Sequence, residues 1–230
     1  ESCLVIDLDP QGNATTGLGL SNLANSEKSI YSVLNGTKKI FDVIEKTHFK
    51  NLDLITSNVD LSGLEVETAG DNRRAFILKD QIMAYLNDSR GIYSHILIDC
   101  PPSLSLLTIM ALVASDSLLV PLQTEFFALE GVSQLMKTID RIKNNLNPEL
   151  AIRGILLTMY DSRLRLSNQV VDEVKKHFGD IVFKTIIQRN IKLGEAPGFG
   201  KDIITYDVTS KGTKNYLSLA DEIIKKNVNV

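Results

Sequence analysis

The sequence has only two cysteines and no apolar stretch long enough to cross a membrane. Cys3 and Cys100 form no CxxC pair and have no histidine at a metal-binding spacing, which argues against a disulfide framework or a zinc site and predicts a reduced, cytoplasmic protein. The longest nearly apolar run, 104–114, is about half of the roughly 20 residues that a membrane helix requires. The first residues show no pattern of a secretion signal.

Positive charge is not in excess either, since the formal net charge is −3. This balance argues against a protein covered with positive charge for nucleic acid. The distribution is uneven, however, because residues 163–192 carry seven Lys or Arg against three Asp or Glu. Any contact with a polyanion is expected in that segment. On charge alone, a solvated basic helix face is the alternative.

The composition does not indicate disorder, because 43% of the residues are apolar and 23% are charged. This usage is typical of a globular protein. We find no internal repeat, low-complexity tract or linker, so residues 1–230 are predicted to form a single domain.

Several short apolar runs each end at a polar residue or a proline. Continuous rather than alternating hydrophobicity is typical of strands buried on both faces of a parallel sheet. We predict strands at 3–6 ending on Asp7, 96–98 ending on Asp99, 117–120 and 152–158, with weaker candidates at 52–56 and 185–187.

Between these runs, apolar residues recur every three or four positions, as on one face of a helix. Helices are predicted at 75–86 with Asp71 as the N-cap, at 129–142, at 170–178 ending at Gly179, and at 216–223; the nearly all-apolar run 104–114 is expected to be a buried helix. Alternating strands and helices predict an α/β fold: a doubly wound, mostly parallel sheet with helices on both faces.

Ligands of such sheets bind beyond the carboxyl ends of the strands, where this sequence places acidic residues. Asp7 and Asp9 lie on a loop stiffened by Pro10, and Asp99 precedes a diproline. A carboxylate at the end of a buried strand loses hydration unless it meets a cation or hydrogen-bond donors. Magnesium with a nucleotide meets that need; the alternative is that each acid only caps its own loop.

Five blocks of sequence together resemble the ParA/Soj partition ATPases, a branch of the deviant P-loop family that also includes MinD. The resemblance covers almost the whole chain in collinear order. The blocks are Asp7 to Asn13, Ile98 to Ser103, Pro121 to Gly131, Thr158 to Arg163 and Gln188 to Pro197.

The resemblance implies ATP and Mg²⁺ as cofactors and assigns roles to individual residues. Asp99 matches the Walker B position that holds the water shell of magnesium, and the resemblance implies that Asp7 lies close enough to share that magnesium network. Asp9 matches the carboxylate linked to activation of the attacking water. The positions expected to line the adenine pocket are Thr158, Met159, Gln188 and Asn190.

The same resemblance implies sequence-independent DNA binding. Arg163 and Lys192 match basic positions that family members use for DNA, and Arg189 is their expected neighbour. All three lie in the basic segment 163–192. Such contacts neutralise phosphates, so their affinity falls steeply with salt and depends little on base sequence.

One family motif is absent from this sequence. The P-loop, of the type K-G-G-x-G-K-T, normally precedes the Asp7 strand by a single helix, and no Gly-rich loop ending in Gly-Lys-Ser/Thr is present. The sequence begins with Glu1, so we expect that it starts inside the natural protein; a genuine P-loop-free relative is the alternative. Residues 1–230 alone are expected to lack ATPase activity, because the phosphates would have neither the backbone donors nor the lysines.

The leading hypothesis is therefore a nucleoid-associated partition ATPase. ATP closes a homodimer that binds DNA, hydrolysis releases the DNA, and a ParB/Spo0J-type partner stimulates turnover. One alternative is a MinD-like membrane-positioning ATPase, which would need the segment 216–230 to bind lipid; packing against the sheet is favoured, and no membrane partner is expected. The other is a DNA-binding or scaffold relative without hydrolysis.

Overall fold

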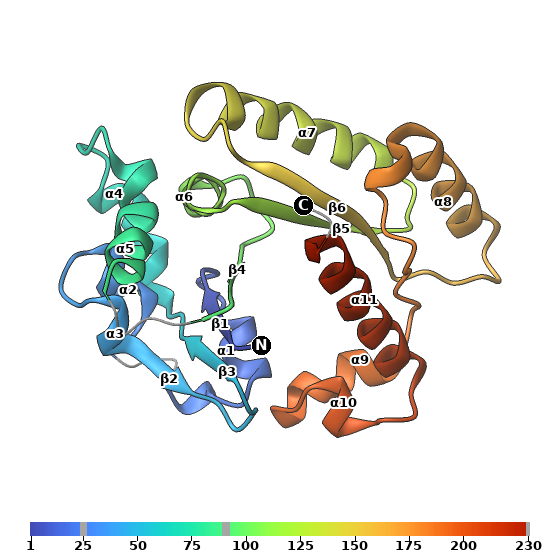
Figure 1. Ribbon diagram of the computed structural model, residues 1–230, viewed down its shortest axis with the longest axis horizontal. Coiled ribbons are helices and arrows are strands. Elements are labelled where there is room, and N and C mark those ends of the chain that lie inside the picture. The colour runs from blue at the N-terminus through green and yellow to red at the C-terminus, as the bar shows by residue number, and fades with distance from the viewer. Residues whose placement is uncertain (24–26, 89–92, 229–230) are drawn as a thin grey trace. The chain divides into compact units, whose positions relative to one another are not determined.

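The computed structural model describes residues 1–23, 27–88 and 93–228 (Figure 1). They form two compact units: unit 1 holds residues 1–115 and 197–201, and unit 2 holds residues 116–196 and the chain from Asp202 onward. The single domain predicted from the sequence stays a prediction. Residues 229–230 of the predicted C-terminal segment lie outside the described residues.

The sheet of unit 1 has the strand order β2-β3-β1-β4. Strand β1 (Cys3–Asp7) is parallel to both β3 (Leu52–Ile55) and β4 (His95–Asp99), and β2 (Ile44–Lys46) is antiparallel to β3. Leu4 and Ile6 are fully buried on the central strand, which explains why the run is apolar throughout. Burial of each such side chain contributes about 1.5–3 kcal/mol.

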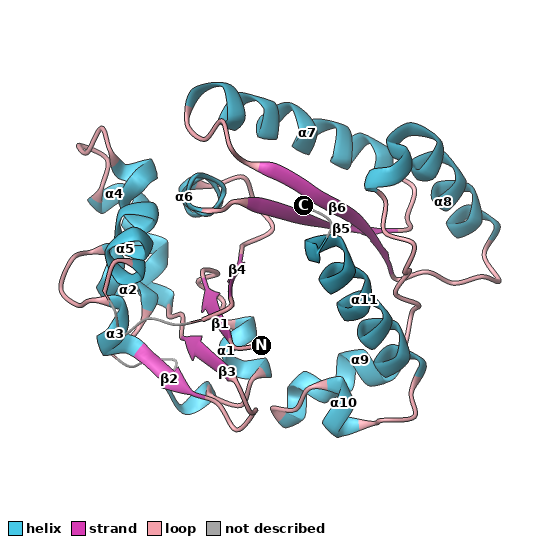
Figure 2. Cartoon of the chain, in the orientation of Figure 1, coloured by secondary structure: helices cyan, strands magenta, loops and turns pink. Residues whose placement is uncertain are grey.

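Helices connect these strands and cover the core of unit 1 (Figure 2). The longest, α5 (Ile77–Leu86) and α6 (Leu106–Ala114), both contribute buried residues to the cluster around β1. Six of the nine α6 residues are buried, which confirms the buried helix expected in the run 104–114. The shorter helices are α1 (Asn13–Gly17), α2 (Ile30–Leu34), α3 (Ile40–Val43) and α4 (Leu64–Glu67).

The predicted N-cap at Asp71 is wrong. Helix α5 begins at Ile77, after a 3₁₀ turn at Arg74–Phe76. The Asp71 carboxylate instead accepts a hydrogen bond from the backbone N–H of Arg73, at 2.7 Å. The side chain therefore closes a local turn two residues long and does not reach the first turn of the helix.

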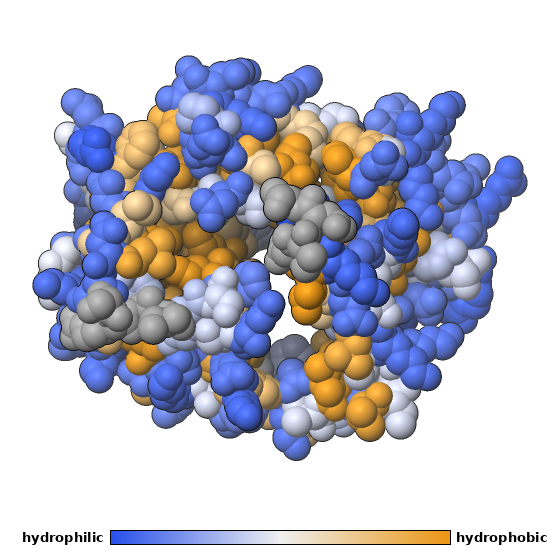
Figure 3. All heavy atoms as spheres, in the orientation of Figure 1, coloured by the Kyte–Doolittle hydropathy of each residue, from blue (hydrophilic) through white to orange (hydrophobic). Residues whose placement is uncertain are grey.

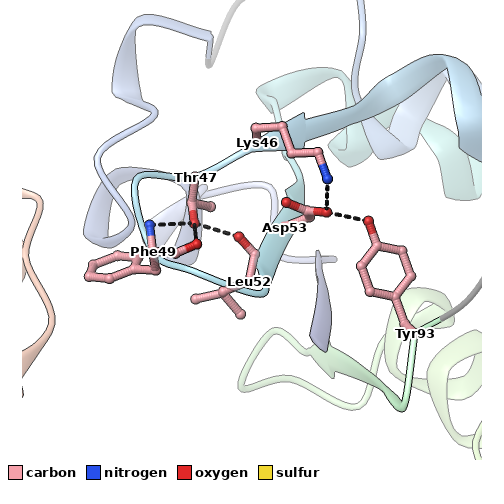
Figure 4. A network of polar contacts seen from close by, with 6 residues as sticks. All are labelled: Lys46, Thr47, Phe49, Leu52, Asp53 and Tyr93. Carbon is pink, nitrogen blue, oxygen red and sulfur yellow. Dashed lines mark hydrogen bonds and ion pairs between the residues drawn. The ribbon is translucent and has the colours of Figure 1, made fainter. Parts of the chain in front are cut away.

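A buried aspartate fixes the end of the sheet opposite Asp7 (Figure 4). Asp53 on β3 is 7% exposed and accepts a bond from Lys46 Nζ at 2.6 Å and another from the Tyr93 hydroxyl. Burial and the contact with Asp53 raise the pKa of Tyr93 above its ordinary value. The carboxylate thus joins β2, β3 and the segment before β4.

Unit 2 contains two long parallel strands, β5 (Ser117–Gln123) and β6 (Ala151–Thr158), with an irregular register between Leu118 and Leu119. Helices α7 (Ala128–Asn145) and α8 (Arg165–Phe178) pack on them through apolar faces, as the periodicity predicts. Gly179, at φ 53°, ends α8 as expected. The remaining helices are α9 (Ile191–Glu195), α10 (Ile203–Tyr206) and α11 (Lys211–Val228).

The weak strand predicted at 185–187 does not form. The segment runs beside β6, but Val182 and Gln188 make only isolated bridges, to Ile155 and Tyr160. The backbone N–H groups of Lys184 and Thr185 donate to the Glu222 carboxylate on α11. Because side chains satisfy these donors, a continuous ladder with β6 is not completed.

Helix α11 packs on the core of unit 2. Leu219 is 7% exposed and belongs to an apolar cluster with Leu156 and Phe183, against which Ile223 also packs. Some apolar side chains remain at the surface (Figure 3). Ile204 of α10 is 44% exposed. Within the described residues, no helix combines the length and hydrophobicity that a membrane span requires.

Candidate functional site

The two predicted acidic strand ends lie side by side in unit 1. Asp7 and Asp99 are direct partners in the parallel register of β1 and β4, and the N–H of Leu8 donates to the carbonyl of Asp99 at 2.9 Å. The strand register therefore places both acids at the carboxyl end of the sheet in unit 1. Asp9 lies two residues beyond Asp7 on the loop that leaves this edge.

Asp7 is fully buried, and both of its carboxylate oxygens accept hydrogen bonds from its own chain. Oδ2 accepts from the backbone N–H and from the hydroxyl of Thr15, each at 2.7 Å. Oδ1 accepts from the N–H of Asp9 at 3.3 Å. Burial raises the pKa of Asp7, and the bonds from Thr15 act against that rise by stabilising the charged form.

The loop around Asp9 is held in a defined shape. Its carbonyl accepts from the N–H of Gly12 at 2.9 Å, and its Oδ1 accepts from the N–H of Gln11 at 3.0 Å. Gly12 has φ 62°, a left-handed conformation that L residues with a side chain adopt at a cost. The sequence Pro10-Gln11-Gly12 therefore forms a turn that presents the half-buried side chain of Asp9 at the sheet edge.

Asp99 has the most exposed side chain of the three acids. Partial removal from water raises its pKa, and the negative charges of Asp7 and Asp9 raise it further. A cation at this edge would relieve that repulsion, and hard carboxylate oxygens suit Mg²⁺. In the described residues, however, no group of three or more Asp, Glu, His or Cys side chains has the arrangement of a preformed metal cage.

A pocket of about 290 Å³ opens within unit 1, and Asp9 is the one of these three acids that lines it. Its wall includes Asp9 and Gln11 from the loop after β1, and Pro101 and Ser103 from the loop after β4. The predicted strand-end loops thus form two sides of one concave surface. This is the position at which open α/β sheets bind their ligands.

The residues predicted for adenine gather at the end of β6 in unit 2. Thr158 ends the strand, and Met159 follows in a left-handed conformation with φ 54° and 41% exposure. The isolated bridge between Tyr160 and Gln188 brings the second predicted segment alongside. The structure therefore places Thr158 and Met159 next to the chain of Gln188.

Asn190 has a structural task at the start of α9. Its side-chain oxygen accepts from the N–H of Lys192 at 2.9 Å, which makes it the N-cap of that helix. The backbone N–H of Gln188 donates to Asn215 of α11 at 3.1 Å. These bonds fix the backbone of the segment and leave the Gln188 side chain for other contacts.

The basic residues predicted for DNA lie near the same strand end, and two of them have an acidic partner. Arg163 forms a two-point contact with Asp161, at 2.9 and 2.6 Å. The bonds from Arg163, with a smaller contribution from the charge of Arg189, lower the pKa of Asp161 to about 2. Arg163 itself remains 85% exposed at its side chain.

Lys192 has a similar arrangement on α9. Its Nζ lies 2.8 Å from Oε2 of Glu195 and 5.7 Å from the ring centre of Tyr206. The bond to Glu195 raises the pKa of Lys192, which therefore stays charged at neutral pH. Arg189 is exposed, and its backbone N–H donates to the carbonyl of Tyr160 at 2.9 Å.

Sequence reasoning missed two residues of the acidic site, Thr15 and Ser57. Both side chains are fully buried and take part in the hydrogen bonds around Asp7 and Asp9. Thr15 lies in the short helix α1, and Ser57 follows β3. Thr15 lies just beyond the Asp7 to Asn13 block, and Ser57 directly follows the weak strand candidate at 52–56, but neither hydroxyl was singled out there.

Known proteins are similar to this sequence over nearly the whole chain. A family model described as an AAA domain matches residues 1–152. The chain is 47% identical over 226 residues to the chromosome partitioning protein ParA of Caulobacter vibrioides, covering 98% of this chain and 84% of that protein. The chain belongs to the ParA/Soj family.

Another ParA/Soj relative agrees with this assignment, and a solved structure supports the fold. The sporulation initiation inhibitor protein Soj of Bacillus subtilis is 47% identical over 220 residues, covering 96% of this chain and 85% of Soj. Cobyrinic acid a,c-diamide synthase of Mycobacterium smegmatis, solved with a bound ATP analogue and magnesium, is 30% identical with a TM-score of 0.73, covering 92% of this chain and 85% of that one. The ParA/Soj chain thus has a mostly parallel, P-loop NTPase-like fold.

Proposed function

We propose that the full-length protein is a magnesium-dependent partition ATPase that acts on DNA in the cytoplasm. The observation that carries this proposal is the meeting of Asp7, Asp9 and Asp99 at the carboxyl edge of β1 and β4. Relatives named as chromosome-partitioning proteins and a structural neighbour with bound ATP analogue and magnesium support it. ATP closes a homodimer, the dimer binds DNA, and hydrolysis releases it.

In this proposal the acids of unit 1 divide the work. Asp99 holds the hydrated magnesium, because it is exposed, acidic and in need of a counter-charge. The ion that Asp99 would hold would supply neutralisation of the phosphate charge. Asp9 orients the attacking water through its half-buried carboxylate and accepts the proton of that water, a task that contributes about 10²–10⁴-fold to a rate. Asp7 lies in the same cluster of acidic residues.

Residues of unit 2 serve recognition. We assign Thr158, Met159, Gln188 and Asn190 to the adenine base, with backbone groups as the main contacts. Arg163, Arg189 and Lys192 contact DNA phosphates, and a partner of the ParB/Spo0J type stimulates hydrolysis. The grouping of these residues around the Tyr160–Gln188 bridge supports the assignment.

The burial of Leu219 disfavours the MinD-like alternative. A lipid-binding helix presents its apolar face to the membrane, whereas Leu219 and Ile223 of α11 pack in the core of unit 2. The hydrolysis-free scaffold is disfavoured by the loop around Asp9, whose turn presents a carboxylate beside a pocket.

The deciding experiment measures retention on unrelated DNA fragments by the full-length protein with ATP and with ADP. We expect tight retention with ATP only, and a loss of affinity with rising salt. Equal retention with the two nucleotides would contradict the switch. Absence of ATP hydrolysis with and without DNA would contradict the enzyme assignment.

A charge-reversal series tests the DNA residues. Lys192→Glu is expected to weaken DNA retention and to reduce the dependence on salt by about one counterion per phosphate contact. Lys137→Glu on α7, an exposed lysine outside the basic segment, is the matched control and is expected to retain binding. Equal losses in both variants would indicate a general effect of net charge.

A further inference from the structure

A ring of hydrogen bonds encloses the backbone of Asp9 in unit 1. The N–H of Asp9 donates to Oδ1 of Asp7, and Oδ2 of Asp7 accepts from the hydroxyl of Thr15. The Thr15 hydroxyl oxygen accepts from the N–H of Ser57 at 3.0 Å, and the Ser57 hydroxyl donates back to the carbonyl of Asp9 at 2.5 Å. The ring begins and ends on Asp9.

The members of this ring come from three separate segments. Asp7 ends β1, Thr15 lies in α1, and Ser57 follows β3. All three are 0% exposed, so water does not compete for their bonds. Asp9 is the member whose side chain reaches the pocket. The ring therefore ties Asp9 to the sheet and restricts the movement of its loop.

Asp7 has little capacity left for a metal. Its side chain has no contact with solvent, and three donors already occupy its two oxygens. A magnesium ligand is expected to keep an oxygen open toward the ion or its waters. The bonding pattern instead resembles that of a buried carboxylate that organises the backbone around it.

We propose that Thr15 and Ser57, acting through Asp7, are positioning residues that hold the Asp9 carboxylate in its working geometry. This inference rests on the proposed ATPase function of Asp9. Displacement of a reacting group by about 1 Å can cost on the order of 100-fold in rate, so a loose loop at Asp9 would reduce turnover without reducing nucleotide binding.

The central test compares Thr15→Val with Thr15→Ser in the full-length protein. Valine has nearly the same shape but removes the two hydroxyl bonds, to Asp7 and from Ser57, and keeps the backbone N–H bond to Asp7, whereas serine keeps the hydroxyl. We expect Thr15→Val to lower kcat for ATP hydrolysis about 10- to 100-fold with an unchanged KM for ATP, and Thr15→Ser to restore most of it. Ser57→Ala, which opens the ring at the Asp9 carbonyl, is expected to lower kcat less.

A buried threonine of unit 2 provides the matched control. Thr213 is 0% exposed, and its hydroxyl lies within hydrogen-bond distance of the carbonyls of Ile203 and Asp207. Thr213→Val is expected to lower the unfolding temperature but to leave kcat near that of the wild type. If it reduced kcat as much as Thr15→Val at a similar unfolding temperature, the proposed positioning role would be refuted.

Two further measurements distinguish the positioning role from a role of Asp7 in metal binding and from a failure of the proposed function. Asp7→Asn is expected to leave the magnesium concentration for half-maximal activity unchanged; a tenfold increase would place Asp7 in the metal network and overturn the ring's role. Amide hydrogen exchange, measured without nucleotide, is expected to accelerate at Asp9 and Ser57 in Thr15→Val only. Unchanged exchange would overturn the inference, whereas faster exchange in a protein without ATPase activity would overturn only the proposed function.

Discussion

Gly154 and Phe183 pack so closely that a β-carbon at position 154 would lie 2.5 Å from a ring carbon of Phe183. Phe183 is fully buried, so its ring has no space into which to move. This contact brings the segment after α8 against β6 and explains why the strand contains a glycine despite the usual cost of glycine in strands.

The first prediction follows from that contact. Gly154→Ala is expected to destabilise the fold by about 1–3 kcal/mol, because the added methyl group overpacks the core. Urea unfolding followed by circular dichroism measures the change. Gly131→Ala in α7 is the control, since a β-carbon at position 131 would meet nothing within 4 Å and alanine favours helix. It is expected to be neutral or stabilising; a loss equal to that of Gly154→Ala would contradict the packing argument.

The second prediction concerns the Asp161–Arg163 pair. The bonds from Arg163 lower the pKa of Asp161 to about 2, so the stabilisation from this pair is complete above about pH 4 and is lost as the pH falls toward 2. Carboxyl carbon NMR measures the titration directly. Arg163→Gln is expected to return the pKa of Asp161 toward its ordinary value near 4. A titration near 4 in the unsubstituted protein would contradict the two-point contact.

The third prediction addresses Asp99. Asp99→Asn removes the exposed charge that we assign to magnesium, and it is expected to reduce ATP hydrolysis on the order of 100-fold. The magnesium concentration for half-maximal activity is also expected to increase. Asp140→Asn on α7 removes an exposed charge far along the sequence from the acidic residues and serves as the control. An unchanged magnesium requirement in Asp99→Asn would remove that assignment.

The fourth prediction concerns the carboxylate that replaces a strand ladder in unit 2. Partial burial opposes ionisation of Glu222, but the N–H bonds from Lys184 and Thr185 outweigh it and lower the pKa of Glu222. Its stabilisation is therefore present above about pH 4.5 and is lost as the pH falls below that value. Glu222→Gln is expected to cost about 1–2 kcal/mol at pH 7, measured by urea unfolding.

The pH dependence supplies the control for this fourth prediction. The difference in free energy of unfolding between Glu222→Gln and the unsubstituted protein is expected to shrink as the pH is lowered from about 5 to about 3. Asp221→Asn, its exposed neighbour, is expected to show little difference at any of these pH values. A difference that stays constant over the whole range would contradict the role of the charged form.

The sequence predicted best those strands and helices in which the spacing of apolar residues reflects which faces are buried. The apolar runs before Asp7 and Asp99 are strands, and the periodic stripes of α7 and α8 are helices, because burial on both faces or on one face leaves a distinct spacing. The short helices α1 to α4 were not predicted. Each has five residues or fewer, which is too short for helical periodicity to be recognised.

The acidic site was predictable only in part. Strand ends locate Asp7, Asp9 and Asp99, and the family resemblance names their roles. Sequence spacing cannot show that Thr15 bonds Asp7, or that Ser57, 48 residues from Asp9, closes the ring. The failure at 185–187 has a similar cause, because a distant side chain, Glu222, supplies the acceptors that a neighbouring strand would have supplied.

The burial of the ring around Asp9 has a consequence for how the protein responds to ionic strength. Mobile ions cannot enter the space around Asp7, Thr15 and Ser57, so the geometry of Asp9 is insulated from them. Arg163 is exposed, so the DNA-phosphate contact that we propose for it would be weakened by the same ions. Under the proposed function, raising the salt concentration is therefore expected to release the protein from DNA while ATP hydrolysis continues, so that the two activities can be measured separately.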